Sequence, residues 1–267
     1  MKTLVAATDA EQLARFRREA EIAMKVRSPG LVGVFEIGTF EAAGGTVPYL
    51  VMELLDGHDL GWFLRKTRQL ELREVVAMGT QVAIGLRDAH AAGIVHRDIK
   101  PQNVFRHEAN GAATWKVLDF GVSKLQDSQG TLTQNQVVGT PSYMSPEQAR
   151  GLVVDARSDL FSLGAVLYRA LTGQPAFRGA DTPTILFDVV YRNPKRPSEL
   201  APSLPPDLDL VLAIAVAKRP ADRFASATEL ADALQAGATG QLPRALRERA
   251  AAILGDLPWG ERLQDFR

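Results

Sequence analysis

Two acidic motifs of the sequence carry side chains that could work on phosphate groups. Residues 96–103 (HRDIKPQN) contain the carboxylate of Asp98, the ammonium group of Lys100 and the carboxamide of Asn103. A second motif, LDFG, places Asp119 21 residues after Asp98. Phosphoryl transfer needs the phosphates positioned, their charge neutralised by metal and the attacking hydroxyl held in line. These residue types suit those tasks, since carboxylate and amide oxygens are hard ligands for Mg²⁺.

The first motif resembles the catalytic loop of protein kinases, and the second resembles their magnesium-binding motif. The resemblance implies that Asp98 accepts or orients the proton of a substrate hydroxyl and that Lys100 contacts the transferring phosphoryl group. It implies further that Asn103 and Asp119 hold Mg²⁺ and that ATP is the donor. A lysine two residues after the aspartate is the serine/threonine version of this loop, which favours a protein substrate. Each tripeptide alone can arise by chance, but their order and the further matches argue against coincidence.

A third motif, residues 138–147 (VGTPSYMSPE), resembles the end of a kinase activation segment and contains Thr140. Ser145 stands where this family usually has alanine. The resemblance implies that Glu147 pairs with Arg223, which lies in the later run RPADRF. If that pair is buried, breaking it would cost about 3–5 kcal/mol.

Two further charged residues are expected to act on the catalytic loop. Asp159 resembles the helix-start carboxylate that braces the loop backbone, and the alternative is an ordinary favourable charge at a helix N-terminus. Between residues 121 and 139 the chain is polar and contains Thr131 and Thr133. Arg97 could pair with a phosphate on either threonine and so order this regulatory loop. The alternative is a solvated loop, with Arg97 bonded elsewhere.

Residues 49–57 (YLVMELLDG) resemble the hinge that binds adenine in this family. The resemblance places Met52 at the gate of the adenine pocket. The backbone groups of Glu53 and Leu55 would then bind adenine, so their side chains need no special chemistry. The end of a strand in an ordinary sheet would look much the same.

The start of the chain resembles the kinase strand that carries the phosphate-binding lysine. Lys2 takes the place of that lysine, and Glu19, 17 residues later, fits its partner carboxylate on the next helix. The alternative is a solvated terminal lysine. On the kinase interpretation the family's Gly-rich loop is absent, with a gene-start error as the leading explanation and true truncation as the alternative. We therefore expect weak or no ATP turnover from the chain as written.

Hydrophobic periodicity predicts the elements that must position these residues. Apolar residues at helical spacing predict helices over residues 11–26 and 71–92, another after residue 153, and one opened by Pro243 in the tail. Apolar, β-branched runs predict an antiparallel pair, 31–37 with 49–55, and a hairpin across Asn110-Gly111. The Pro-rich residues 196–206 are expected to form an exposed loop, and the tail helix is expected to pack on its own large lobe.

Composition limits the class of protein. The 267 residues have a mass of 29.0 kDa and are 46% hydrophobic, which is ordinary for a globular chain. Lys plus Arg (31) balances Asp plus Glu (31), so no positive field points to nucleic acid. The absence of cysteine excludes disulfides and thiolate metal sites. No run reaches the length of a membrane span and the N-terminus lacks a signal-peptide pattern, so we expect a cytoplasmic protein.

The sequence therefore predicts an α+β, two-lobed, protein-kinase-like fold. We expect a truncated, β-rich N-lobe (residues 1–55), a mainly helical C-lobe (56–236) and a tail with an amphipathic helix (237–267). The predicted activity is that of a serine/threonine protein kinase that transfers the γ-phosphoryl group of ATP to Ser or Thr of protein substrates. Its own activation loop is expected to be among these substrates, with self-association of two chains allowing that reaction. A non-catalytic pseudokinase that binds partners is the alternative, against which the presence of Asp98, Asn103 and Asp119 argues. A small-molecule phosphotransferase is the third hypothesis.

Overall fold

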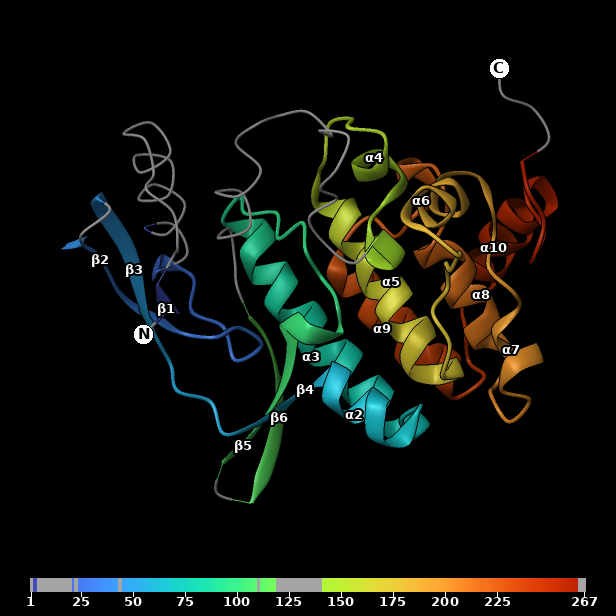
Figure 1. Cartoon of the computed structure of the whole chain (residues 1–267). Helices are drawn as coiled ribbons and strands as arrows, with labels where there is room; N and C mark the ends of the chain where they lie inside the picture. Colours follow the sequence, from blue (N-terminus) through green and yellow to red (C-terminus); the bar gives the residue numbers. More distant parts are fainter. Residues whose placement is uncertain are drawn as a thin grey trace.

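The computed structural model describes residues 2–3, 21, 24–42, 45–109, 111–118 and 141–263. Figure 1 shows a small sheet at one side of the molecule and a larger body of helices at the other, with a second sheet below them. Most of the helix predicted over residues 11–26 lies outside the described ranges, and Glu21, Met24 and Lys25 are helical. None of the helices in these ranges is long and apolar enough to cross a membrane.

The first sheet has three antiparallel strands in the order β1-β3-β2. Its strands are β1 (Lys2–Thr3), β2 (Val34–Ala42) and β3 (Gly45–Met52). The predicted antiparallel pair is confirmed, although β2 starts later than expected and continues to Ala42. Lys2 pairs with Leu50, a buried residue of the central strand. The strand that carries Lys2 is therefore joined directly to the strand that ends at Met52.

The second sheet is a hairpin with one short added strand, in the order β4-β5-β6. It consists of β4 (Gly57–Asp59), β5 (Val104–Ala109) and β6 (Ala112–Val117). Gly111, in the turn, has a φ of +76°, which glycine adopts without steric cost. The predicted hairpin is confirmed. The hairpin begins directly after Asn103 and ends directly before Leu118. It therefore brings the end of the HRDIKPQN motif close to the start of the LDFG motif.

Two helices lie between β4 and β5 in sequence. In α2 (Leu60–Thr67), the Asp59 side chain accepts a hydrogen bond from Trp62 N at 2.7 Å and caps the first turn. The predicted long helix is confirmed as α3 (Leu72–Ala91). Its predicted apolar stripe is fully buried: Val75, Met78, Val82, Leu86 and Ala89. This helix ends close to the catalytic-loop motif and directs the chain into it.

The remaining helices follow in the second half of the chain. They are α4 (Pro146–Ala149), α5 (Ala156–Thr172), α6 (Thr182–Tyr191), α7 (Pro197–Leu200), α8 (Pro206–Ala215), α9 (Ala227–Ala238) and α10 (Arg244–Asp256). Short 3₁₀ turns cover Pro101–Asn103, Pro141–Tyr143 and Pro220–Asp222. Helix α5 is buried along nearly its whole length, and its predicted core residues Leu160, Leu163 and Leu167 are inaccessible to solvent. It is the central helix around which α3, α8 and the turn Pro141–Tyr143 pack.

The turn that precedes β2 attaches the first sheet to the rest of the molecule. Val32 N donates to Val117 O at 3.0 Å, and Val117 N donates to Gly30 O at 2.8 Å. The neighbouring Leu31 is buried in the main hydrophobic core. A Cβ on Gly85 of α3 would lie 2.6 Å from the Gly30 carbonyl oxygen, closer than real Cβ atoms approach. Glycine at this position therefore permits direct contact between the turn and the helix backbone.

The expectation of an exposed loop over residues 196–206 is correct only in part: several of its residues are exposed, but the segment is neither all loop nor all exposed. This segment contains the one-turn helix α7, and its Pro197, Ala201 and Leu204 are buried. Asp209 of α8 holds it, since Oδ1 accepts from Ser198 N at 2.9 Å and Oδ2 from the Ser198 hydroxyl at 2.6 Å. The segment contains several prolines, but the apolar residues Ala201 and Leu204 between them pack into the hydrophobic core.

The tail helix packs on the helical body, as predicted. In α10 the Ala250 side chain is fully buried, and Leu242 is buried just before the helix begins. Leu246, Ile253 and Leu254 are partly buried against the same core. Pro243 precedes the first helical residue, where its fixed φ favours helix entry.

Candidate active site

The three predicted catalytic residues lie together on one short loop. Lys100 Nζ donates to Asp98 Oδ2 at 2.6 Å. Asn103 Nδ2 donates to the Asp98 backbone oxygen at 2.8 Å and to Asp98 Oδ2 at 2.9 Å. Because the Asn103 amino group is turned toward Asp98, its Oδ1 is left as the coordinating atom, a hard oxygen that fits Mg²⁺. The turn Pro101–Asn103 fixes the spacing between the residues.

Asp159, at the start of α5, braces the loop from below. Its Oδ2 accepts from His96 N at 2.8 Å and its Oδ1 accepts from Arg97 N at 2.7 Å. His90 Nε2, on the last turn of α3, donates to Asp159 Oδ2 at 2.8 Å. The carboxylate is fully buried, and charge-assisted hydrogen bonds of this kind offset the cost of burying it. The predicted bracing contact is therefore formed, with His90 as an additional partner.

His96 connects the catalytic loop to the second motif. Asp98 N donates to His96 Nδ1 at 3.1 Å, so Nδ1 acts as the acceptor. Nε2 then carries the proton and donates to Leu118 O at 2.7 Å. Leu118 directly precedes Asp119, and Leu118 N donates to Asn103 O at 2.9 Å. The buried imidazole thus ties the entry to the LDFG motif to the loop that carries Asp98.

Arg97 has an unusual backbone and an unsatisfied side-chain donor. Its φ is +68°, in the left-handed region that non-glycine residues rarely adopt. Within the described part of the chain, its Nε is buried without a hydrogen-bond partner. Its carbonyl oxygen accepts from Gln148 Nε2 of α4 at 2.7 Å. Such an unpaired donor on a half-buried arginine suits an anionic partner.

Glu147 and Arg223 form the predicted ion pair, and it is buried. Nη1 and Nη2 of Arg223 each lie 2.7 Å from a different Glu147 carboxylate oxygen, which is bidentate geometry. The Ser158 hydroxyl also donates to Glu147. Burial raises the pKa of Glu147, but the hydrogen bonds and charge of Arg223 outweigh it and hold that pKa below its ordinary value. The pair joins α4 to the loop between α8 and α9.

The predicted hinge residues lie at the end of β3 and just after it, and the side chain of Glu53 forms specific hydrogen bonds. Met52 ends the strand and Leu55 lies three residues later. Glu53 N donates to Gly33 O at 2.8 Å, and Gly33 N donates back to Glu53 Oε2 at 3.1 Å. Lys116 Nζ donates to both Glu53 carboxylate oxygens, at 2.9 and 2.8 Å. Burial raises the pKa of Glu53, but the hydrogen bonds from Lys116 and Gly33 together have the larger effect. The net result is a pKa below the ordinary value of a glutamate.

Several predicted site residues lie outside the described residues. These are Glu19, Asp119, Thr131, Thr133 and Thr140. The expected Lys2–Glu19 pair, the Asp119 metal ligand and the phosphate partners of Arg97 therefore stay predictions. Among the described residues no cluster of three or more His, Asp or Glu side chains is arranged to hold a metal ion.

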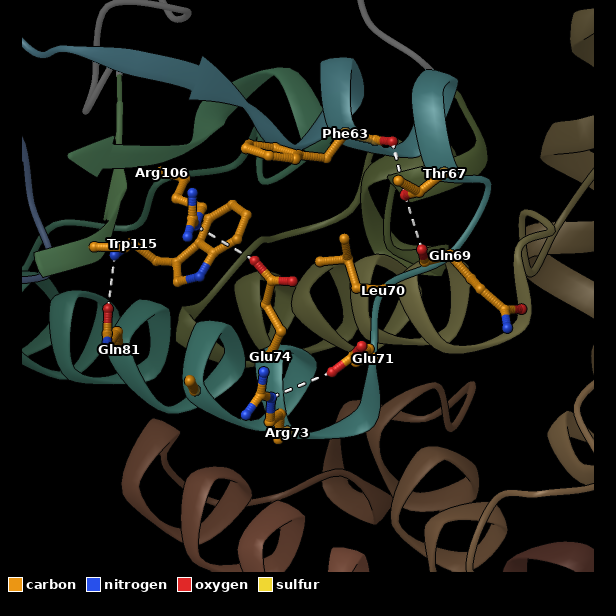
Figure 2. A pocket seen from close by; sticks show the side chains of 12 residues that line it. Phe63, Thr67, Gln69, Leu70, Glu71, Arg73, Glu74, Gln81, Arg106 and Trp115 are labelled. Carbon is orange, nitrogen blue, oxygen red and sulfur yellow. Dashed lines mark hydrogen bonds and ion pairs between the residues drawn. The ribbon is translucent and has the colours of Figure 1, made fainter. Parts of the chain in front are cut away.

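A pocket of about 710 Å³ lies away from the catalytic loop, between α2, the start of α3 and the β5–β6 hairpin (Figure 2). Phe63 and Trp115 supply aromatic surface, and Arg106 Nε lies 3.3 Å from Glu74 Oε1 across it. None of the catalytic-loop residues that the structure describes lines this pocket. It is therefore separate from the candidate active site.

Three contributing residues were not predicted, and each had some signal in the sequence. His90 ends the long helix six residues before His96, where a polar side chain can reach the loop. Lys116 is a single charge within an apolar strand, which suggests a specific partner. Gln148 completes a capping box with Ser145 in α4, a pattern that the sequence shows directly.

Comparison with known proteins identifies related chains. The family model described as protein kinase domain matches residues 1–233. A probable serine/threonine-protein kinase of Corynebacterium efficiens is 40% identical over 239 residues, which are 87% of this chain and 36% of that protein. Serine/threonine-protein kinase PknB of Mycobacterium tuberculosis is 39% identical over 233 residues, 86% of this chain and 37% of PknB. The chain thus spans about a third of the length of these curated relatives.

Solved structures show the same architecture. The crystal structure of the Mycobacterium tuberculosis PknI kinase domain is 32% identical and superposes with a TM-score of 0.66. The match covers 86% of this chain and 81% of that one. The predicted α+β kinase fold, a small β-rich part with a mainly helical part, is confirmed.

Proposed function

The chain belongs to the protein kinase domain family, and we propose that it transfers the γ-phosphoryl group of ATP to serine or threonine hydroxyls of proteins. The bacterial relatives named as serine/threonine-protein kinases support this assignment. The observation that carries the proposal is the hydrogen-bonded set Asp98, Lys100 and Asn103 on one braced loop. A lysine two residues after the aspartate is the pattern of this loop that we expect in a kinase acting on serine and threonine.

Each residue of the set has a distinct task in the proposed reaction. Asp98, whose side chain is 28% exposed, would accept the hydrogen bond of the incoming hydroxyl and hold its oxygen in line. Lys100 is held by Asp98 close to the point of attack and would offset the charge of the transferring group. Asn103 Oδ1 and Asp119 would hold Mg²⁺, which when bound neutralises the phosphate oxygens. Adenine would contact the backbone of Glu53 and Leu55 beside Met52.

Regulation by phosphorylation is part of the proposal. The buried Nε of Arg97, which has no hydrogen-bond partner among the residues that the structure describes, supports an anionic partner for this residue. A phosphate on Thr131 or Thr133 would supply that charge and order the segment between Leu118 and Pro141. Self-association of two chains would allow each to modify the other.

We further propose the division into an N-lobe (1–55), a C-lobe (56–236) and a tail (237–267), and a cytoplasmic location.

Phosphate incorporation measured by mass spectrometry tests the proposed activity. The 267-residue chain and a version extended upstream of Met1 in the same reading frame are incubated with Mg-ATP and a Ser/Thr peptide. We expect Asp98→Asn to lower the transfer rate by about 10²- to 10⁴-fold, because the hydroxyl loses the basic carboxylate that can accept its proton. The matched control is Asp232→Asn, an exposed aspartate on α9, which should leave the rate unchanged. Folded protein without phosphate transfer in any version would favour the non-catalytic binding module.

A further inference from the structure

The tail helix touches the loop that carries Arg223. Helix α10 follows residue 233, where the match to the kinase family ends. Arg249, in the middle of this helix, faces the turn between α8 and α9. Its Nε donates to Asp222 O at 3.1 Å, and its Nη2 donates to Arg223 O. Its Nη1 lies 3.1 Å from Glu229 Oε1 on α9. One guanidinium group thus holds two consecutive backbone carbonyls and a carboxylate.

This contact is geometrically selective. The guanidinium group has five donors in a rigid plane, so one arginine can hold several acceptors at fixed positions. Glu229 also accepts from Ala225 N at 2.6 Å through its other oxygen, so the carboxylate clamps the far side of the same turn. The Arg249 guanidinium carbon lies 5.9 Å from the ring centroid of the buried Phe224. The backbone of residues 222–225 is therefore fixed from both ends by Arg249 and Glu229.

The turn that Arg249 holds positions the buried Arg223 side chain. Arg223 reaches α4 through its bidentate pair with Glu147. The next residue of α4, Gln148, donates from Nε2 to Arg97 O in the catalytic loop at 2.7 Å. Three hydrogen-bonded contacts, linked covalently through Arg223 and through the Glu147–Gln148 peptide bond, thus connect α10 with the 222–225 turn, α4 and the residue beside Asp98.

We propose that Arg249 is a positioning residue for α4, the segment that ends the activation-segment motif and borders the catalytic loop. The tail helix then contributes to kinase function, because it determines the position of α4 relative to Asp98. The kinetic consequence rests on the proposed kinase function, whereas the structural coupling does not. A substrate peptide that docks near α4 would bind less well when Arg249 is lost.

Other contacts of α10 provide the controls. Arg247 docks the helix onto α8, since its Nη2 donates to Asp207 Oδ2 at 2.6 Å. Within the described part of the chain, its hydrogen bonds go to Asp207, Gly240 and Leu242 and none reaches the 222–225 turn. Arg244 has a 91% exposed side chain, and among the described residues it forms an ion pair only with Glu248 of the same helix, at 2.6 Å. Arg247→Ala therefore weakens the docking of α10 without removing the contact to Arg223. Arg244→Ala changes the same residue type without either effect.

Amide hydrogen exchange of the folded chain tests the coupling without requiring activity. In Arg249→Ala we expect exchange to accelerate about tenfold or more in the 222–226 turn and in α4, because charge-assisted hydrogen bonds are lost. In Arg247→Ala the acceleration should be confined to α10 and its contact with α8, and Arg244→Ala should match the unchanged chain. Unchanged exchange in α4 of Arg249→Ala would overturn the proposal. Equal acceleration there in Arg247→Ala would overturn it too, since any loosening of α10 would then suffice.

Steady-state kinetics provides a second test, on whichever form of the protein, the 267-residue chain or its upstream extension, transfers phosphate at a measurable rate. We expect Arg249→Ala to raise the peptide KM several-fold while the KM for ATP changes by less than about twofold. Equal changes in both would contradict a positioning role directed at α4. If no version transfers phosphate, the proposed function fails, while the exchange measurement still decides the coupling.

Discussion

Replacing Glu147 by Gln is expected to destabilise the fold strongly, although the side chain keeps its size. The Arg223 side chain is 1% exposed, and its charge is neutralised by the Glu147 carboxylate at two 2.7 Å contacts. A glutamine amide would remove that charge and would turn a donor toward another donor. Breaking a buried ion pair at one partner costs about 3–5 kcal/mol. The equilibrium constant for unfolding would therefore rise roughly 10²- to 10⁴-fold.

Urea unfolding followed by circular dichroism measures this cost, and the melting temperature should fall by about 6–20 °C. Glu248→Gln is the matched control, because it breaks the exposed pair with Arg244 and should cost less than about 0.5 kcal/mol. The double variant Glu147→Gln with Arg223→Met should recover part of the loss, since no unpaired charge stays buried. A cost for Glu147→Gln as small as that of the control would refute the reasoning that the buried charge dominates.

Three further outcomes follow from the same contacts. Asp159→Asn should cost about 1.5–3 kcal/mol in urea unfolding and speed amide exchange at His96 and Arg97, because an amide cannot accept from both of these N–H groups. Since the folded pKa of Glu147 is lowered, its contribution to stability is present above about pH 4.5. That contribution should be lost as pH falls through the folded pKa, and acid titration of Glu147→Gln should lack this component. Burial raises the pKa of Tyr143 to about 12, so stability should decline as pH rises from about 10, and less so in Tyr143→Phe, with ultraviolet absorbance reporting ionisation.

The local elements were predictable because their signals are local. The helix over residues 71–92 and the hairpin around Gly111 follow from periodicity and turn chemistry, and both are confirmed. The Glu147–Arg223 pair, 76 residues apart in sequence, was predictable only through the family resemblance. The sequence pattern was only partly right at residues 196–206, where prolines suggested an exposed loop but the apolar Ala201 and Leu204 between them are buried.

Contacts between distant polar residues could not be predicted from the sequence. Lys116 and Glu53 are 63 residues apart, and nothing near either one specifies the other. Their pairing depends on the register between the turn before β2 and strand β6, which is fixed only when the tertiary structure forms. The contact of Arg249 with the Arg223 carbonyl depends in the same way on how α10 crosses the end of α8. Such contacts are set by packing rather than by propensity.

In the part of the chain that the structure describes, contacts just before β2 and just after β3 hold the first sheet to strand β6 and helix α3. One contact lies directly after Met52, where Glu53 is bonded to Lys116. The other lies at the turn where Gly30 meets Val117 and the backbone of Gly85. Lys116 and Val117 are consecutive residues of β6, so both contacts converge on one strand and a shift of β6 would be passed directly to the sheet. A side chain at position 30 or 85 would push the turn away from α3 and so disturb this connection.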